Sequence, residues 1–105
     1  MKSDYIIVLT TVGSKELAET LAKDIILERL AACVQIQQIE SFYAWADKVE
    51  HGDEYLLTIK TRATLFEDLS QFILKNHDYK IPEIIQIPIM QGSKPYLEWL
   101  KAATK

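Results

Sequence analysis

The sequence contains little cysteine and no long apolar run. Its single cysteine, Cys33, cannot form a disulfide within the chain. No apolar stretch approaches the ~20 residues that a helix needs to cross a bilayer, which excludes a membrane span. The first four residues lead into only a brief apolar stretch, which is a poor match to a signal peptide. These features predict a reduced, cytoplasmic protein.

Positive charge is also scarce. The formal net charge is -3 at pH 7 and the sequence pI is ≈ 5.3, and the lysines are scattered along the chain. A protein that binds the phosphate backbone usually carries its lysines and arginines on one face. We therefore expect no nucleic-acid partner.

The common catalytic and cofactor motifs are absent from the sequence. There is no Gly-x-Gly-x-x-Gly, no Walker-type loop and no Gly-x-Ser-x-Gly elbow, and no Cys-x-x-Cys, His-x-x-x-His or His-Glu-x-x-His spacing. His77, Tyr79 and Glu83 are suited to proton transfer, but residues this close in sequence on a turn and a strand need not converge. The sequence thus predicts a protein that is not an enzyme.

What the chain has is the composition of one small globular domain. It is 105 residues long, 49% hydrophobic and 26% charged. A chain of this length can bury roughly two-thirds of its unfolded surface and needs no disulfides to be stable. We expect a single domain over residues 1–105.

The first half of the chain alternates strand, helix and strand patterns. The apolar residues Leu17, Leu21 and Ile25 lie four apart and indicate one face of a helix. An extended pattern then leads to Gly52, which can adopt the positive φ of a hairpin turn. The predicted elements are a strand over Tyr5–Val12, a helix from Leu17 to about Leu30, and an extended strand from Ala32 to a turn at Glu50–Asp53.

The second half repeats this order and adds a helix. Thr64 and Glu67 have the spacing of a capping box. Pro88 cannot donate a ladder hydrogen bond, so its strand is expected at a sheet edge. The predicted elements are a strand over Glu54–Thr61, a helix that ends near Asn76, a strand over Ile84–Met90, and a short final helix with Pro95 in its first turn.

This order predicts the α+β class, as a ferredoxin-like β-α-β-β-α-β sandwich followed by a short C-terminal helix. The hairpin of the second and third strands is overlong, because its first strand is about three times the usual 5–6 residues. It would leave Phe42, Tyr43 and Trp45 and an unpaired strand edge in water, which monomers avoid. We expect this hairpin to pair with another subunit.

Several segments in this order resemble the CutA family of divalent-ion tolerance proteins, and the resemblance covers almost the whole chain. They are "RLAACVQI" (29–36), "YAW" (43–45), "EYLLTIKT" (54–61), "HDYKIPEI" (77–84) and "YLEWL" (96–100). The resemblance implies a ferredoxin-like protomer, a homotrimer, and a link to copper and other divalent cations. The trimer of that family also looks like that of the PII signalling proteins. The chain departs from the family at Asp47, where glycine is usual, and at Asp78 and Lys80, where proline and an acid are usual.

The candidate metal ligands are His77, Cys33 and Glu83. A thiolate beside an imidazole suits copper or zinc, so the expected cofactor is Cu(II) or another divalent cation. The alternatives are that Cys33 is a small buried hydrophobe and that His77 only caps the carbonyls at the end of its helix. The predicted fold separates Cys33 and His77 by about the length of the sheet, ~17 Å, so a shared site would have to form between subunits.

A cleft between subunits is the other candidate site. We expect Tyr79 and Lys60 to line it, with Tyr43 and Trp45 on the opposite wall, unless these two aromatic residues only pack the core or the trimer. The sequence therefore predicts a non-catalytic homotrimer that binds divalent metal, Cu(II) above others, and contributes to metal-ion tolerance. The alternative is a PII-like trimeric signalling module that binds a small ligand or a partner loop in this cleft.

Overall fold

The computed structural model describes residues 3–105 and contains one four-stranded antiparallel sheet with three α-helices. The strand order is β2-β3-β1-β4, with all pairs antiparallel, as expected of a ferredoxin-like sandwich. The predicted α+β class is confirmed. The strands are β1 (Tyr5–Val12), β2 (Cys33–Trp45), β3 (Lys48–Arg62) and β4 (Ile85–Pro88), and the helices are α1 (Lys15–Leu27), the 3-10 turn η1 (Ala63–Leu65), α2 (Phe66–Lys75) and α3 (Lys94–Ala103).

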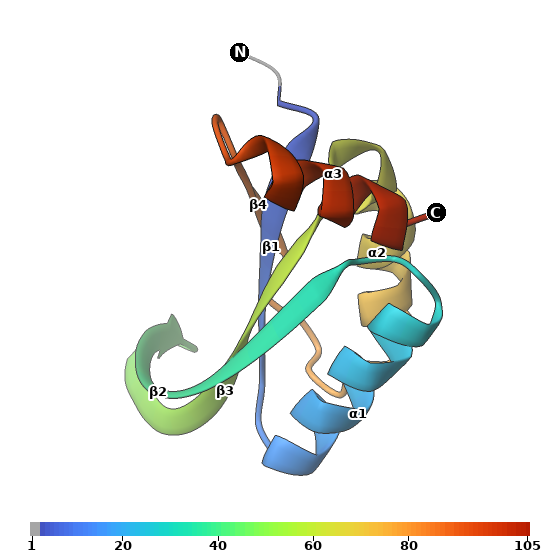
Figure 1. Ribbon diagram of the computed structural model, residues 1–105. Helices are drawn as coiled ribbons and strands as arrows, with labels where there is room; N and C mark the ends of the chain where they lie inside the picture. The colour runs from blue at the N-terminus through green and yellow to red at the C-terminus, as the bar shows by residue number, and fades with distance from the viewer. Residues whose placement is uncertain (1–2) are drawn as a thin grey trace.

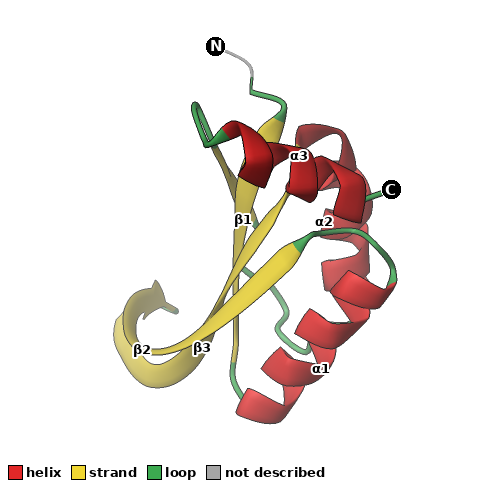
Figure 2. Ribbon diagram, in the orientation of Figure 1, coloured by secondary structure: helices red, strands yellow, loops and turns green. Residues whose placement is uncertain are grey.

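The helices α1 and α2 lie together on one side of the sheet, as Figures 1 and 2 show. The side chain of Ser14 accepts a hydrogen bond from the backbone N–H of Leu17 (3.1 Å), which caps α1. The apolar face that was predicted for α1 packs toward the sheet. The core between helices and sheet consists of Ile6, Val8, Val12, Ala18, Leu21, Ile25, Leu30, Ala31, Leu57, Ile59, Leu69 and Ile73.

The start of α2 differs from the prediction. Thr64 lies inside η1, and the N-cap residue of α2 is Leu65, which makes no side-chain capping bond. The predicted capping box of Thr64 and Glu67 is therefore wrong. The 3-10 turn has its own backbone bond, from Phe66 N–H to the carbonyl of Ala63, and this shifts the helix start past Thr64. The predicted end near Asn76 is correct.

The hairpin turn lies at Ala46–Asp47, and the predicted turn at Glu50–Asp53 is wrong. Both turn residues have positive φ, 51° and 62°. Two consecutive left-handed residues are the backbone of a type I′ turn, whose twist matches that of the flanking strands. Gly52 lies instead within β3, opposite Ser41. The third strand consequently begins six residues before the predicted start at Glu54.

The β2–β3 hairpin extends beyond the rest of the sheet. The last β3 residue that pairs with β1 is Tyr55, opposite Val12. Residues 39–54, which we call the hairpin arm, project past that point over seven cross-strand pairs, which corresponds to ~23 Å. Figure 1 shows the arm curling away from the helices. The overlong hairpin is confirmed as a feature of the chain.

The strand β4 is an edge strand, as Pro88 indicated, and it is shorter than the predicted Ile84–Met90. Pro88 lies opposite Ile6 at the end of the ladder. The helix α3 follows, with Pro95 in its first turn as predicted. The Nζ atom of Lys60 lies 5.9 Å from the ring centroid of Tyr96, so α3 meets the sheet face to which Lys60 belongs.

The face of the sheet opposite α1 and α2 is largely apolar, and we call it the open face. Side chains alternate along each strand, so this face carries the residues next to the core positions. Ile85 and Ile87 of β4 remain 48% and 43% exposed there. The open face comprises Ile7, Leu9, Leu56, Ile85 and Ile87, which are brought together by the pairing of β1 with β3 and β4.

Candidate functional site

A cleft of about 700 Å³ lies between the hairpin arm and the loop of residues 78–83. The side of the arm that continues the open face points toward this loop. Its lining residues are Thr11, Ser41, Phe42, Tyr43, Trp45, Glu50, Glu54, Asp78, Tyr79, Lys80, Ile81 and Glu83. Clefts of several hundred Å³ are typical of sites for small molecules.

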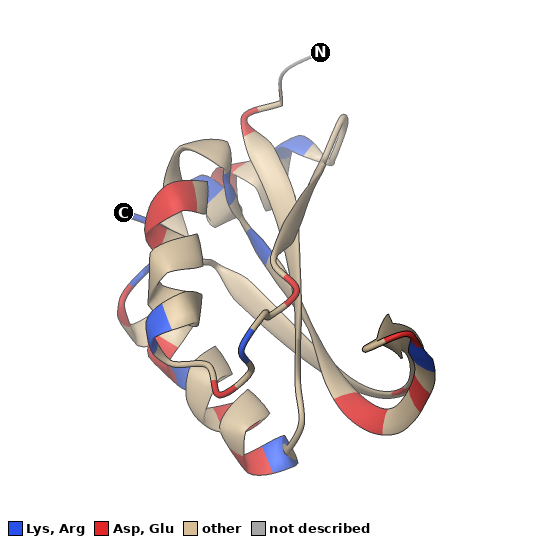
Figure 3. Ribbon diagram, turned by 180° about the vertical axis from the view of Figure 1, so that it is seen from behind, with Lys and Arg blue, Asp and Glu red and all other residues tan. Residues whose placement is uncertain are grey.

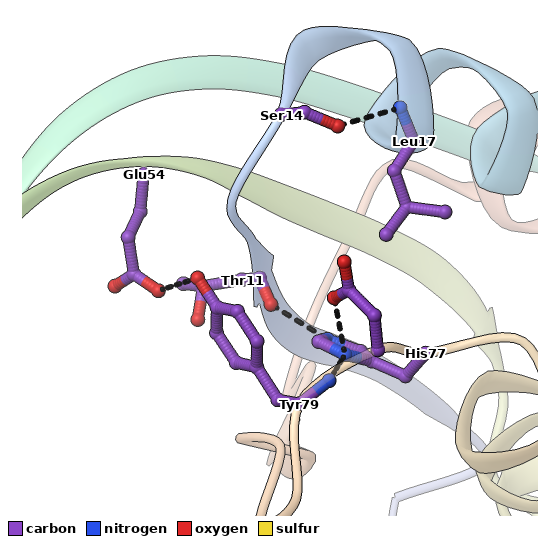
Figure 4. A network of polar contacts seen from close by, with 7 residues as sticks. Thr11, Ser14, Leu17, Glu54, His77 and Tyr79 are labelled. Atoms are coloured by element: carbon purple, nitrogen blue, oxygen red, sulfur yellow. Dashed lines mark hydrogen bonds and ion pairs between the residues drawn. The ribbon is translucent and has the colours of Figure 1, made fainter.

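Tyr79 ties the loop to the base of the arm. Its hydroxyl donates a hydrogen bond to Glu54 Oε2 (2.8 Å), as Figure 4 shows. The pKa of Tyr79 is strongly raised, first by burial, then by the hydrogen bond to Glu54, and then by the negative charges of Glu54 and Asp78. The phenol therefore stays protonated to higher pH than an exposed tyrosine does, and it acts as a donor.

His77 holds the start of this loop against β1. Its Nε2 lies 2.7 Å from the backbone carbonyl of Thr11, and its Nδ1 lies 3.0 Å from the backbone N–H of Tyr79 (Figure 4). The N–H of Tyr79 can only donate, so Nδ1 accepts and Nε2 carries the proton that is donated to Thr11. The ring is thus the neutral Nε2–H tautomer. Asp78 Oδ1, 3.7 Å from Nδ1, would form an ion pair only with a protonated ring.

This geometry bears directly on His77 as a metal ligand. Both ring nitrogens are engaged in hydrogen bonds, and the side chain is 0% exposed. A metal ion would have to displace one of these bonds. The side chain does not cap α2 either; Asn76 does so, through a 2.8 Å bond from Nδ2 to the carbonyl of Phe72.

Cys33 lies far from His77. Cys33 pairs with Lys60 of β3, and Lys60 pairs with Ile7 of β1. His77 instead contacts the carbonyl of Thr11, further along β1. Four residues along β1 and two strand spacings separate these positions by roughly 16 Å. Within residues 3–105 there is no group of three His, Cys, Asp or Glu side chains positioned to hold a metal ion.

The other predicted residues divide between two ends of the sheet. Tyr43 and Trp45 from the arm, and Tyr79 and Glu83 from the loop, all line the cleft. Lys60 does not line this cleft within one chain, and its predicted place in a cleft between subunits stays a prediction. Lys60 pairs with Cys33 toward the other end of β3 and extends to Tyr96 instead.

The cleft lining also contains residues that were not singled out from the sequence. Thr11 forms its floor, and Glu50 and Glu54 lie on the same face of β3 because they are four residues apart. Glu50 lies opposite Tyr43, and this pairing follows only from the position of the turn. Figure 3 shows acidic positions on both the arm and the loop.

Acidic side chains dominate the charge of the cleft. Glu50, Glu54, Asp78 and Glu83 contribute four carboxylates, and Lys80 is the single basic residue among the described lining residues. The lining thus has a formal charge of -3, which is as large as the formal net charge of the whole chain. A cleft of this charge attracts cations. None of the helices within residues 3–105 has the length and apolar character needed to cross a membrane.

The fold and the cleft define a small ferredoxin-like protein with an open apolar sheet face and a projecting hairpin arm. Residues 6–103 match the family of CutA1 divalent ion tolerance proteins. The chain belongs to this family.

Individual relatives agree with this assignment. The chain is 48% identical over 101 residues to the chloroplastic protein CutA of Arabidopsis thaliana, covering 95% of this chain and 56% of that protein. It is 42% identical over 99 residues to the divalent-cation tolerance protein CutA of Thermus thermophilus, covering 93% and 96%. The crystal structure of CutA1 from Oryza sativa superimposes with a TM-score of 0.95 at 47% identity, covering 98% of this chain and 95% of that one. The chain thus spans little more than half the length of the Arabidopsis protein and nearly all of the Thermus protein.

Proposed function

We propose that the protein is a non-catalytic homotrimer that binds divalent cations, Cu(II) above the others, and thereby contributes to divalent-cation tolerance. The observation that carries the assembly is the open face. A single chain leaves Ile85 and Ile87 about half exposed next to Ile7, Leu9 and Leu56. A contiguous apolar patch of this kind marks an interaction surface.

The hairpin arm supports the same assembly. β2 is an edge strand along its whole length, so its outer backbone groups have no sheet partner within the described chain. Phe42 and Val49 on the arm are 69% and 80% exposed. A long edge with exposed apolar side chains favours pairing with another chain. Copies of this chain that cover each other's open faces and pair along the outer edge of β2 would satisfy both surfaces.

The cation-binding part of the proposal rests on family membership and on the four carboxylates of the cleft. Oxygen and nitrogen sites bind Cu(II) more tightly than Zn(II) and the other divalent first-row metals. Because no described group of three ligands is preassembled in one chain, we propose that ligands from more than one subunit hold the ion. Glu83 and Cys33 remain candidate ligands in that arrangement.

Light scattering after size exclusion tests the assembly. The expected mass is three times the 12.1 kDa of one chain. Ile87→Lys places a charge on the open face and should lower the mass. Leu27→Lys is the matched control, because Leu27 is 71% exposed at the end of α1, away from that face. A wild-type mass of one chain, or equal effects of both variants, would refute the proposal.

Calorimetric titration of metal-free protein tests the cation. Cu(II) should bind more tightly than Zn(II), and Glu83→Gln should weaken Cu(II) binding. Glu40→Gln is the control: Glu40 is a carboxylate of the arm that pairs with His51 (3.3 Å) and does not line the cleft. The absence of saturable Cu(II) binding to a trimer would refute metal binding and leave the assembly intact.

A PII-like trimeric module that binds a small ligand is the second candidate function. The observation that favours it is the aromatic lining of the cleft. The ring faces of Tyr43, Trp45 and Tyr79 offer no donor atom to a divalent metal ion, whereas they can pack against an organic ligand.

A further inference from the structure

We infer that the cleft binds an organic cation with N–H donors, of the class of linear alkylammonium compounds such as polyamines. This inference rests on the second candidate function, ligand binding in the cleft. Three independent features of the lining point to this class of ligand: its aromatic rings, its charge, and a hydroxyl group at its floor.

Aromatic rings contribute to the cleft from both of its sides. Tyr43 and Trp45 come from the arm and are 49% and 50% exposed, and Tyr79 comes from the loop and is 37% exposed. Ring faces attract an ammonium or guanidinium group within about 6 Å, and Trp does so most strongly. Exposed rings on two sides of an acidic cleft fit an organic cation better than a hydrated metal ion.

The carboxylates supply acceptors for N–H donors. Glu54 uses Oε2 for the hydroxyl of Tyr79, and no described hydrogen bond uses its Oε1. Glu50 lies four residues further along the same face of β3, toward the tip of the arm. Two carboxylates spaced along a strand by ~13 Å suit a linear molecule with more than one positive charge. An ammonium group has three donors and no acceptor, which matches a lining rich in acceptors.

Thr11 provides the third feature. It is only 6% exposed, yet it lines the cleft. Its carbonyl accepts from His77, whereas no hydrogen bond within residues 3–105 involves its hydroxyl. Figure 4 shows its side chain on the side of Tyr79 and Glu54, away from His77. A hydroxyl that faces the cleft and has no partner among the described residues can accept a hydrogen bond from an N–H donor bound at Glu54.

Titration calorimetry with spermidine tests this inference. The protein is kept as the full assembled chain in buffer with EDTA, so that metal binding does not contribute. Spermidine should bind saturably. The first control is 1,8-octanediol, an uncharged chain, which should not bind. The second control is choline, a cation that lacks N–H donors, which should bind more weakly than spermidine.

Two pairs of variants locate the site. Trp45→Leu and Glu54→Gln should each weaken spermidine binding by about tenfold. Trp99→Leu and Glu40→Gln, which alter an exposed ring and a carboxylate outside the lining, should leave it unchanged. Thr11→Val keeps the shape of the floor and removes its hydroxyl, so it tests the site without altering the arm. It should weaken spermidine binding and leave choline binding unchanged.

Three results would overturn the inference. They are no saturable spermidine binding, equal losses in Glu40→Gln and Glu54→Gln, which indicate general charge attraction, and equal affinities for spermidine and choline. None of these results depends on the mass of the assembly or on Cu(II) binding. Failure of this inference is therefore distinct from failure of the proposed trimer and its metal site.

Discussion

Replacement of His77 by alanine should destabilise the fold and leave Cu(II) affinity unchanged. The substitution removes the bond from Nε2 to the Thr11 carbonyl and the bond from the Tyr79 N–H to Nδ1. Each such bond contributes about 1 kcal/mol net to the free energy of unfolding. The side chain is 0% exposed, so the cavity and the lost burial add about 1–2 kcal/mol. The expected loss for His77→Ala is about 3–4 kcal/mol.

The assay is equilibrium urea unfolding at one fixed protein concentration, since assembly makes stability depend on concentration. His51→Ala is the matched control. His51 is 47% exposed and pairs with Glu40 at 3.3 Å, an exposed contact that contributes about 0–1 kcal/mol. The reasoning is refuted if both variants lose the same stability. It is also refuted if His77→Ala keeps its stability but loses Cu(II) affinity, because His77 would then be a metal ligand.

Three further predictions concern buried hydroxyls, the hairpin turn and alkaline pH. Thr10→Val should stabilise the protein by about 1 kcal/mol, because the Thr10 hydroxyl is buried without a partner. Thr61→Val should destabilise it by about 1–2 kcal/mol, because the buried 2.7 Å bond from the Thr61 hydroxyl to the carbonyl of Leu30 is lost. Thermal unfolding of both variants checks this pair. Asp47→Gly should raise the free energy of unfolding by about 0.5–1 kcal/mol in urea titrations, since Asp47 has φ 62°. The pKa of Tyr79 is raised in the folded state, so its contribution to stability is complete below the unfolded value of about 10 and is lost as pH rises above it. Unfolding measured from pH 9 upward should therefore show a steeper decline for the wild type than for Tyr79→Phe.

Local sequence signals determined the elements whose structure depends on their own residues. The four-residue spacing of Leu17, Leu21 and Ile25 predicted α1 because one face of a helix repeats at that spacing. Pro88 predicted an edge strand because proline lacks the ladder donor, and β4 lies at the edge. The cross-strand order followed from the alternation of strands and helices, which leaves few topologies.

The hairpin turn could not be located from local signals. Gly52 is the residue that most easily takes positive φ, yet the turn lies at Ala46 and Asp47. Left-handed backbone at these two residues costs free energy, which the long β2–β3 ladder offsets. A ladder is a property of the two paired strands together. Because the predicted turn was misplaced, the sequence did not indicate that Glu50 pairs with Tyr43 beside the cleft.

The candidate site itself was decided by tertiary structure. The sequence determined which residue types were available: His77, Tyr79 and Glu83 in one segment, and Tyr43 and Trp45 in another. Only the fold showed that both nitrogens of His77 are engaged, because one partner is the carbonyl of Thr11, 66 residues away. The same long-range contacts bring Thr11 and Glu54 to Tyr79 and leave Lys60 at the other end of β3. Sequence spacing reports neighbours along a chain, whereas a cleft is formed by segments that only folding brings together.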